Sequence, residues 1–285
     1  MFGKRPDGRV VRNIEPLQMI MPYIMKTRND SMNMYEDTFD CAGMDAYIKS
    51  KENEGIKLSY MHILIAATVR VIALRPQLNR FVMNGRIYAR PKIWVSFVVH
   101  PTLEDASIET TIKLCFEGTE TLHEIAKVVN DAIEKETTKR TQENGTDKLA
   151  RALTRVPSPI IKFAVNTLMW MDKHSILPKA VINLSPFHTS FFITNLKSLG
   201  INYIHHHTYN FGTTGLFFAI GKEKMIPVVK GNETIHQKHM GFALVSDERF
   251  CDGLYFAMSL RLLRKIMRNP ALLEKPLDKK MEDVK

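Results

Sequence analysis

The stretch Ser246-Asp247-Glu248-Arg249-Phe250-Cys251-Asp252-Gly253 stands between a β-prone segment and a helix-forming run near the carboxyl end of the chain. The preceding residues, 241–246, are predicted to form a strand. From Gly253 to Arg268 the apolar residues recur at helical spacing, until Asn269-Pro270 ends the pattern. Asp252 is a residue type that commonly caps the amino end of a helix. The stretch therefore predicts a tight junction between a strand and a helix, with polar side chains at the strand's end.

This junction resembles the His-x-x-x-Asp-Gly motif in the catalytic domain of the 2-oxoacid dehydrogenase (dihydrolipoyl) acyltransferases and their relative chloramphenicol acetyltransferase. Asp252 and Gly253 match the motif, whereas Glu248 occupies the position of the histidine. In that family the imidazole takes a proton from a thiol or hydroxyl acceptor, and the aspartate maintains the local structure. The resemblance therefore covers the motif except for its base.

Three further segments resemble the same family, and they follow one another in the family's order. Residues 21–28 resemble its opening helix. Residues 58–76 resemble a long apolar helix, which ends here in Arg75-Pro76-Gln77-Leu78-Asn79. Phe191-Phe192-Ile193-Thr194-Asn195-Leu196 resembles a strand in which a serine supports the oxyanion, and Thr194 stands at that serine's position. Single matches of this kind are weak signals, and their shared order over residues 16–275 carries the resemblance.

The resemblance implies a two-layer α/β fold of the chloramphenicol acetyltransferase type, with a mixed sheet and helices. It also implies coenzyme A or acyl-coenzyme A as a substrate and a homotrimer with the active site between subunits. The expected organisation is an N-terminal arm at 1–15, one acyltransferase-like domain at 16–275 and a C-terminal tail at 276–285. Within the domain, about 147–184 is expected to be a helical insertion that has no counterpart in the compact members of the family.

The periodicity of the chain independently favours mixed α/β structure. We predict a helix near 40–48 that Gly55 ends, and a buried helix that Ser59 caps and Pro76 stops. Asn84-Gly85 predicts a hairpin, and Thr121 is expected to cap another amphipathic helix. Further strands are predicted at 93–100, 108–116, 190–195, 203–207, 216–220 and 241–246. The absence of a strict βαβ rhythm or a Gly-x-Gly-x-x-Gly turn favours a mixed two-layer sheet over a nucleotide-binding fold.

Composition is typical of a soluble globular protein, with 45% hydrophobic residues among 285. The three cysteines lack disulfide or zinc-knuckle spacing, and no secretory signal is visible, so a cytoplasmic location is expected. The apolar stretch 160–171 is too short to cross a bilayer, so no transmembrane segment is expected. A net charge of +10 suits a phosphorylated ligand such as coenzyme A. Because the basic residues are spread along the chain, nucleic-acid binding is not expected.

Acyl transfer requires a base, an oxyanion donor and a groove that excludes water. Thr194 is the candidate donor, although a threonine also suits strand packing. Asp252 is a candidate hydrogen-bond acceptor at the site and, equally, a helix cap. Glu248 leaves three interpretations open. They are a base activated by burial, a structural ion pair, and loss of function at this motif, because an exposed carboxylate is a poor base for a thiol.

Histidines offer a substitute base. His206, in His205-His206-His207, is the leading candidate, and His188 precedes the Thr194 strand. An alternative is a zinc or nickel site formed by His205 and His207 with a second pair, His236 and His239. Its spacing matches no recognised signature, so we expect no metal.

The predicted function is therefore acyl transfer between coenzyme A and a thiol or hydroxyl acceptor, with Glu248, Asp252, Thr194 and His206 as candidate catalytic residues. The acceptor is expected to be a small molecule or carrier-bound group, because the residues before 16 leave no room for a lipoyl-bearing segment. The alternative is a catalytically silent trimeric assembly or ligand-binding protein of the same fold. Glu248 is the feature that favours this alternative.

Overall fold

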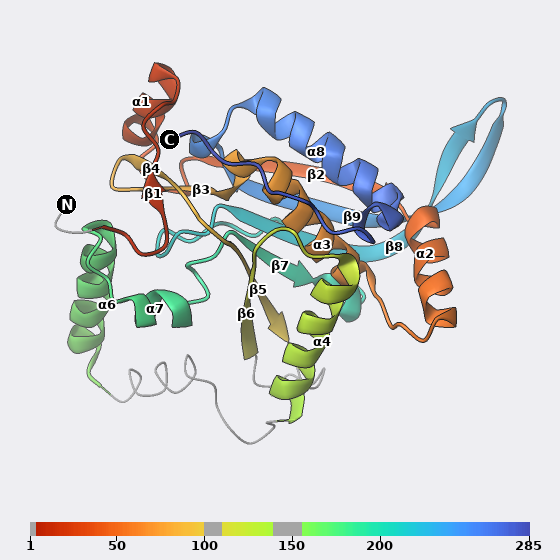
Figure 1. Ribbon diagram of the computed structural model, residues 1–285, viewed down its shortest axis with the longest axis horizontal. Helices are drawn as coiled ribbons and strands as arrows, with labels where there is room; N and C mark the ends of the chain where they lie inside the picture. Colours follow the sequence, from red (N-terminus) through yellow and green to blue (C-terminus); the bar gives the residue numbers. More distant parts are fainter. Residues whose placement is uncertain (1–3, 100–109, 139–155) are drawn as a thin grey trace.

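A six-stranded mixed sheet forms the centre of the protein, seen in a computed structural model that describes residues 4–99, 110–138 and 156–285 (Figure 1). Its strands are ordered β2-β9-β8-β7-β5-β6. Their bounds are Met32–Asp40 for β2, Glu233–Asp247 for β9, Leu216–Lys230 for β8, Phe191–Asn195 for β7, Ile93–Val99 for β5 and Thr110–Phe116 for β6. Strand β7 runs parallel to both of its neighbours, and the other pairs are antiparallel. The predicted mixed α/β sheet is confirmed.

Four helices bury their apolar sides against one face of this sheet. They are α2 (Ala42–Asn53), α3 (Tyr60–Leu74), α4 (Leu122–Thr138) and α8 (Gly253–Arg268). Helix α3 is buried around nearly its whole circumference, as its sequence predicts, and begins with a capping box in which Ser59 and His62 exchange hydrogen bonds. Thr121 and Glu124 interact in the same way at the start of α4. The predicted caps are therefore confirmed.

A smaller three-stranded sheet lies beside the main one, in the order β1-β4-β3. Its strands are Arg9–Val10 (β1), Arg80–Met83 (β3) and Arg86–Ala89 (β4), and helix α1 (Pro16–Ile24) contacts β4. Asn84 and Gly85 both have positive φ, at 50° and 71°, which is the conformation a tight hairpin requires. The predicted hairpin is confirmed.

The second face of the main sheet carries a small cluster of Phe192, Phe217 and Val245. The segment 201–210 crosses this face, and its closest approach is made possible by glycines at 221 and 241. A Cβ at Gly221 would lie 2.4 Å from the backbone nitrogen of Tyr203. The predicted strand at 203–207 is wrong, because both edges of β8 and β9 are already paired and the segment lies over the sheet instead of joining it.

Helices α6 (Ser158–Lys173) and α7 (Lys179–Leu184) lie at the side of the molecule away from α2 (Figure 1). They fall within the predicted helical insertion, and part of that range, 147–155, lies outside the described residues. None of the helices in the described part of the chain is long and apolar enough to span a membrane. Strands β8 and β9 extend as a long hairpin beyond the sheet, farther than the sequence pattern predicts.

Candidate functional site

The junction after β9 is held by an ion pair that sequence reasoning missed. Both oxygens of Asp247 bind Arg249, with Nε–Oδ1 at 2.8 Å and Nη2–Oδ2 at 2.7 Å, and both side chains are buried. Ser31 donates a hydrogen bond to the same carboxylate, and Arg249 also donates to the carbonyl oxygen of Met25. This clamp fixes the backbone on both sides of Glu248, whose own amide donates to the carbonyl oxygen of Ser31.

Glu248 is exposed and lines a cavity of about 530 Å³ between the junction, α1 and the start of α8. Cys251, Asp252 and Gly253 line the same cavity, together with Gln18 of α1. Within the described residues the Glu248 carboxylate makes no hydrogen bond or ion pair. The single chain therefore positions the carboxylate in a cavity but does not remove it from water.

Asp252 caps α8, as the sequence predicts. Its carboxylate accepts a hydrogen bond from the backbone nitrogen of Tyr255 at 2.8 Å. Arg249 binds the carboxylate of Asp247 and not that of Asp252. Cys251 is buried, and burial raises the pKa of its thiol to about 12, so this residue stays a thiol at neutral pH.

Thr194 lies on the second face of the sheet, because it follows Phe192 by two residues along β7. It pairs with Ala219 on β8, which pairs with Ala243 on β9. Ala243 is two strands away from Thr194, and Glu248 follows Ala243 by five residues. Together these spacings put Glu248 roughly 20 Å from Thr194. One chain alone therefore does not bring these two residues together.

His206 also lies over the second face. Its ring stacks on Phe217, with centroids 4.7 Å apart and planes 14° apart, and its Nε2 is buried without a hydrogen-bond partner. Burial, and then the neighbouring His207, lower its pKa. His206 does not line the Glu248 cavity. The structure thus places Thr194 and His206 on one face of the sheet and Glu248 and Asp252 at the end of β9.

His188, the other candidate base, is part of a buried network. Its Nε2 lies 3.1 Å from Asp172 Oδ2, and its Nδ1 lies 2.8 Å from the hydroxyl of Ser185. Asp172 also forms an ion pair with Arg5 at 2.8 Å, so the network links α6 to the N-terminal arm. Despite the Asp172 pairing, burial lowers the pKa of His188.

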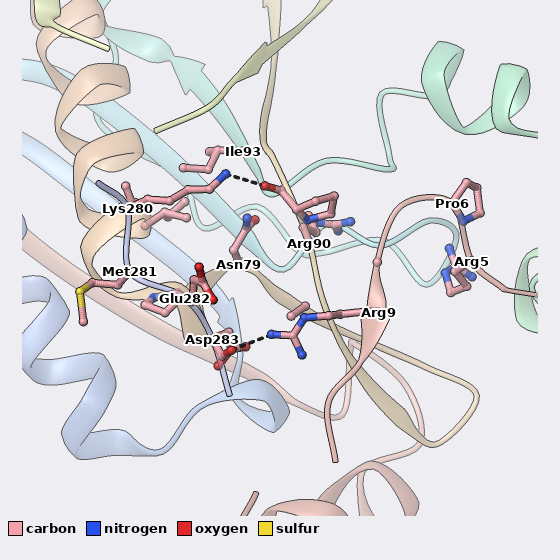
Figure 2. Close-up of a pocket in the computed structure, with 16 residues that line it drawn as sticks. Arg5, Pro6, Arg9, Asn79, Arg90, Ile93, Lys280, Met281, Glu282 and Asp283 are labelled. Carbon is pink, nitrogen blue, oxygen red and sulfur yellow. Dashed lines mark hydrogen bonds between the residues drawn. The ribbon is translucent and has the colours of Figure 1, made fainter. Parts of the chain in front are cut away.

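The metal alternative has no support in the described part of the chain, where no three His, Cys, Asp or Glu side chains are grouped to hold an ion. His205 lies near Glu36, and His239 lies 3.1 Å from the hydroxyl of Thr38. A further cavity, of about 500 Å³, lies between β1 and the C-terminal residues 280–283 (Figure 2). Arg9 and Lys280 line it, and both donate to backbone carbonyls of neighbouring segments.

Comparison with known proteins agrees with this architecture. The dihydrolipoamide acetyltransferase of Azotobacter vinelandii superposes with a TM-score of 0.60 at 14% identity, covering 96% of this chain and 94% of that one. A chloramphenicol acetyltransferase superposes with a TM-score of 0.53 at 12% identity, covering 91% and 99%. The chain has the fold of the coenzyme A-dependent acyltransferases. The resemblance inferred from the sequence is therefore confirmed at the level of the fold.

Among curated proteins, the chain is similar to the dihydrolipoyllysine-residue acetyltransferase component of the acetoin cleaving system of Bacillus subtilis. The two are 24% identical over 226 residues, which cover 79% of this chain and 45% of the relative. The chain thus spans about half the length of the curated relative it matches. No protein-family profile matches the chain.

Proposed function

We propose that this protein is a cytoplasmic acyltransferase that moves an acyl group between coenzyme A and a thiol or hydroxyl acceptor. The observation that carries the proposal is the Asp247–Arg249 clamp, which holds Glu248 in a cavity of about 530 Å³ beside the capping Asp252. The clamp fixes the backbone that carries Glu248, and a general base must be held within hydrogen-bond reach of the proton it takes. Similarity to acetyltransferases of the dihydrolipoyl type supports the reaction class.

A homotrimer would supply what one chain lacks. Helix α1 borders the Glu248 cavity and exposes large apolar side chains, with Leu17 68% exposed and Tyr23 64% exposed. Apolar groups gathered on one helix are typical of a surface that another subunit covers. A neighbouring subunit on this surface would exclude water from Glu248 and bring its own Thr194 toward the cavity.

In this arrangement Glu248 takes the proton from the acceptor thiol, and the thiolate attacks the thioester carbon of the acyl-coenzyme A. The hydroxyl of Thr194 donates a hydrogen bond to the oxyanion that forms. Collapse of the intermediate breaks the bond to the coenzyme A sulfur, which takes the proton back from Glu248. The acyl group ends on the acceptor, and free coenzyme A leaves.

A catalytically silent binding or assembly protein of the same fold is the second candidate. It is favoured by one observation, the exposure of Glu248 and its lack of a partner in the described part of the chain. In this case the chain would bind coenzyme A or a related ligand without turning it over.

Release of coenzyme A thiol from acetyl-coenzyme A and longer acyl donors, with dihydrolipoamide as acceptor, separates the two candidates. We expect turnover that falls at least about a hundredfold in Glu248→Gln. Thr194→Ala is expected to lower it by a similar factor. His206→Ala is assayed beside these variants, because His206 is the candidate substitute base.

Glu248→His is the decisive variant, because it restores the base of the resembled motif. A gain of activity only in Glu248→His, with ligand binding but no turnover in the wild type, would establish the silent alternative. Turnover that is unchanged in both Glu248→Gln and Thr194→Ala would refute the proposed site.

A further inference from the structure

A separate cavity of about 450 Å³ lies between the start of β5, the end of β6 and helix α7. It shares no lining residue with the Glu248 cavity. Pro6 and Arg90, labelled in Figure 2, line both this cavity and the one at the C-terminal residues. Its volume is in the range of pockets that bind small organic molecules. Helix α7 lies within the range 147–184, which the sequence predicts to be a helical insertion.

Lys113 is fixed in the wall of this cavity. Its Nζ donates hydrogen bonds to the carbonyl oxygens of Ile182, at 2.7 Å, and Ser185, at 2.9 Å, which closes the carboxyl end of α7. The same nitrogen lies 4.9 Å from the centroid of the Trp94 ring. A lysine ammonium has three donors, so two carbonyl partners hold it in place and leave one N–H for a ligand.

The charge around this nitrogen is positive. Burial, and then the nearby Arg90, lower the pKa of Lys113 to about 7, although the two carbonyl acceptors favour the ammonium form. Asp7 is the one acidic residue in the described lining, and it is bound by Arg5 at 2.9 and 3.0 Å. Lys113 is therefore only partly protonated at neutral pH without a ligand, and a bound anion would favour its ammonium form.

Lys179 adds a second cation from the first turn of α7. It is exposed, lines the cavity, and forms no ion pair within the described residues. Lys92 also lines the cavity, but it is already paired with Glu117. Thus two amines from different elements, Lys113 of β6 and Lys179 of α7, remain for one ligand.

Apolar groups complete the wall. Trp94, Pro91 and Ile182 line the cavity beside the two amines. An inorganic ion would leave these surfaces in contact with water, whereas an organic body would cover them. The aromatic face of Trp94 suits a flat or apolar group in particular.

We propose that this cavity binds a small organic anion, a carboxylate or a phosphate ester, with Lys113 and Lys179 on the oxyanion and the apolar body against Trp94. The site is distinct from the proposed acyl-transfer site and does not depend on it. The cavity would give helix α7 a binding function of its own.

Calorimetric titration of the whole chain with benzoate, phenyl phosphate and benzyl alcohol tests the proposal and separates the two anion chemistries. At least one of the anions is expected to bind with one site per chain, and benzyl alcohol at least about tenfold more weakly. Lys113→Met should weaken the anion at least about tenfold, and Lys179→Ala roughly threefold. Lys162→Ala, an exposed lysine of α6 outside the cavity, is the matched control and should bind as the wild type does.

Because Lys113 also closes α7, a second measurement uses the unaltered protein. Reductive methylation with formaldehyde and cyanoborohydride converts accessible lysine amines to dimethylamines, which mass spectrometry locates. The anion that binds should protect Lys113 and Lys179 but not Lys162. Failure of both anions to bind, binding no tighter than that of the alcohol, or binding that leaves Lys113 unprotected would each overturn the proposal.

Discussion

The guanidinium of Arg80 forms two hydrogen bonds with the carboxylate of Asp283, at 2.7 and 2.6 Å, and joins the β3 strand to the end of the chain. Both side chains are buried, with 1% and 7% of their surface exposed. Arg80 also donates to the carbonyl oxygen of Phe250, in the junction that carries Glu248. The C-terminal residues are thus part of the structure that supports the candidate site.

Replacing Asp283 with alanine is expected to lower the free energy of unfolding by about 3 kcal/mol, because the buried guanidinium of Arg80 loses its partner. Urea denaturation followed by circular dichroism measures this change. Lys279→Ala is the control, since its pair with Glu282 is exposed and long, at 3.8 Å. Equal stability of the Asp283 and Lys279 variants would contradict the structural role of the pair.

The close crossing of segment 201–210 over the sheet predicts that a side chain at position 241 destabilises the fold. A Cβ there would lie 2.3 Å from Oδ1 of Asn202. Gly241→Ala is therefore expected to destabilise the protein by about 1–3 kcal/mol. Gly253→Ala is the matched control, because a Cβ at that position has no neighbour within 4 Å. A Gly241→Ala variant as stable as Gly253→Ala would show that the segment does not pack as described.

The lowered pKa of His206 predicts a loss of stability in acid. Below about pH 6.5 the unfolded chain binds a proton at this imidazole, while the folded protein, with its lowered pKa, does not until the pH is lower still. The stability advantage of wild type over His206→Phe should therefore shrink between pH 7.5 and 5.5 in urea unfolding. If the stability advantage of the wild type over His206→Phe instead grew as the pH fell, the lowered pKa of His206 would be refuted.

Much of the fold follows from local signals in the sequence. Helix α3 was predictable because its apolar residues are continuous and are bounded by Ser59 and Pro76, and the hairpin because Asn84-Gly85 favours positive φ. The path of the segment 203–207 was not predictable. Its residues favour a β-strand, but they do not indicate whether a strand of the sheet has a free edge to pair with. The glycines at 221 and 241 were the available signal for a close crossing.

In the candidate site, too, the features formed by neighbouring residues were predictable, and the contacts between distant residues were not. The junction at Glu248 and the cap at Asp252 are encoded within a few residues, so the sequence predicts them. The Ser31 contact with Asp247, and the contacts of Lys113 with α7, join residues far apart in the chain. The sequence pattern does not indicate such pairs, because only the tertiary structure brings their residues together. The convergence of Thr194 and Glu248 across subunits stays a prediction for the same reason.

The observed role of Asp252 predicts that its contribution to stability is that of a helix cap. Asp252→Ala removes the acceptor for the backbone nitrogen of Tyr255 and is expected to lower the free energy of unfolding by about 1 kcal/mol. Asp252→Ser retains a capping oxygen and should be nearly as stable as the wild type. If the carboxylate has a further part in acyl transfer, Asp252→Ser will be stable but slower in the coenzyme A release assay. A serine variant that loses as much stability as the alanine variant would contradict the capping role.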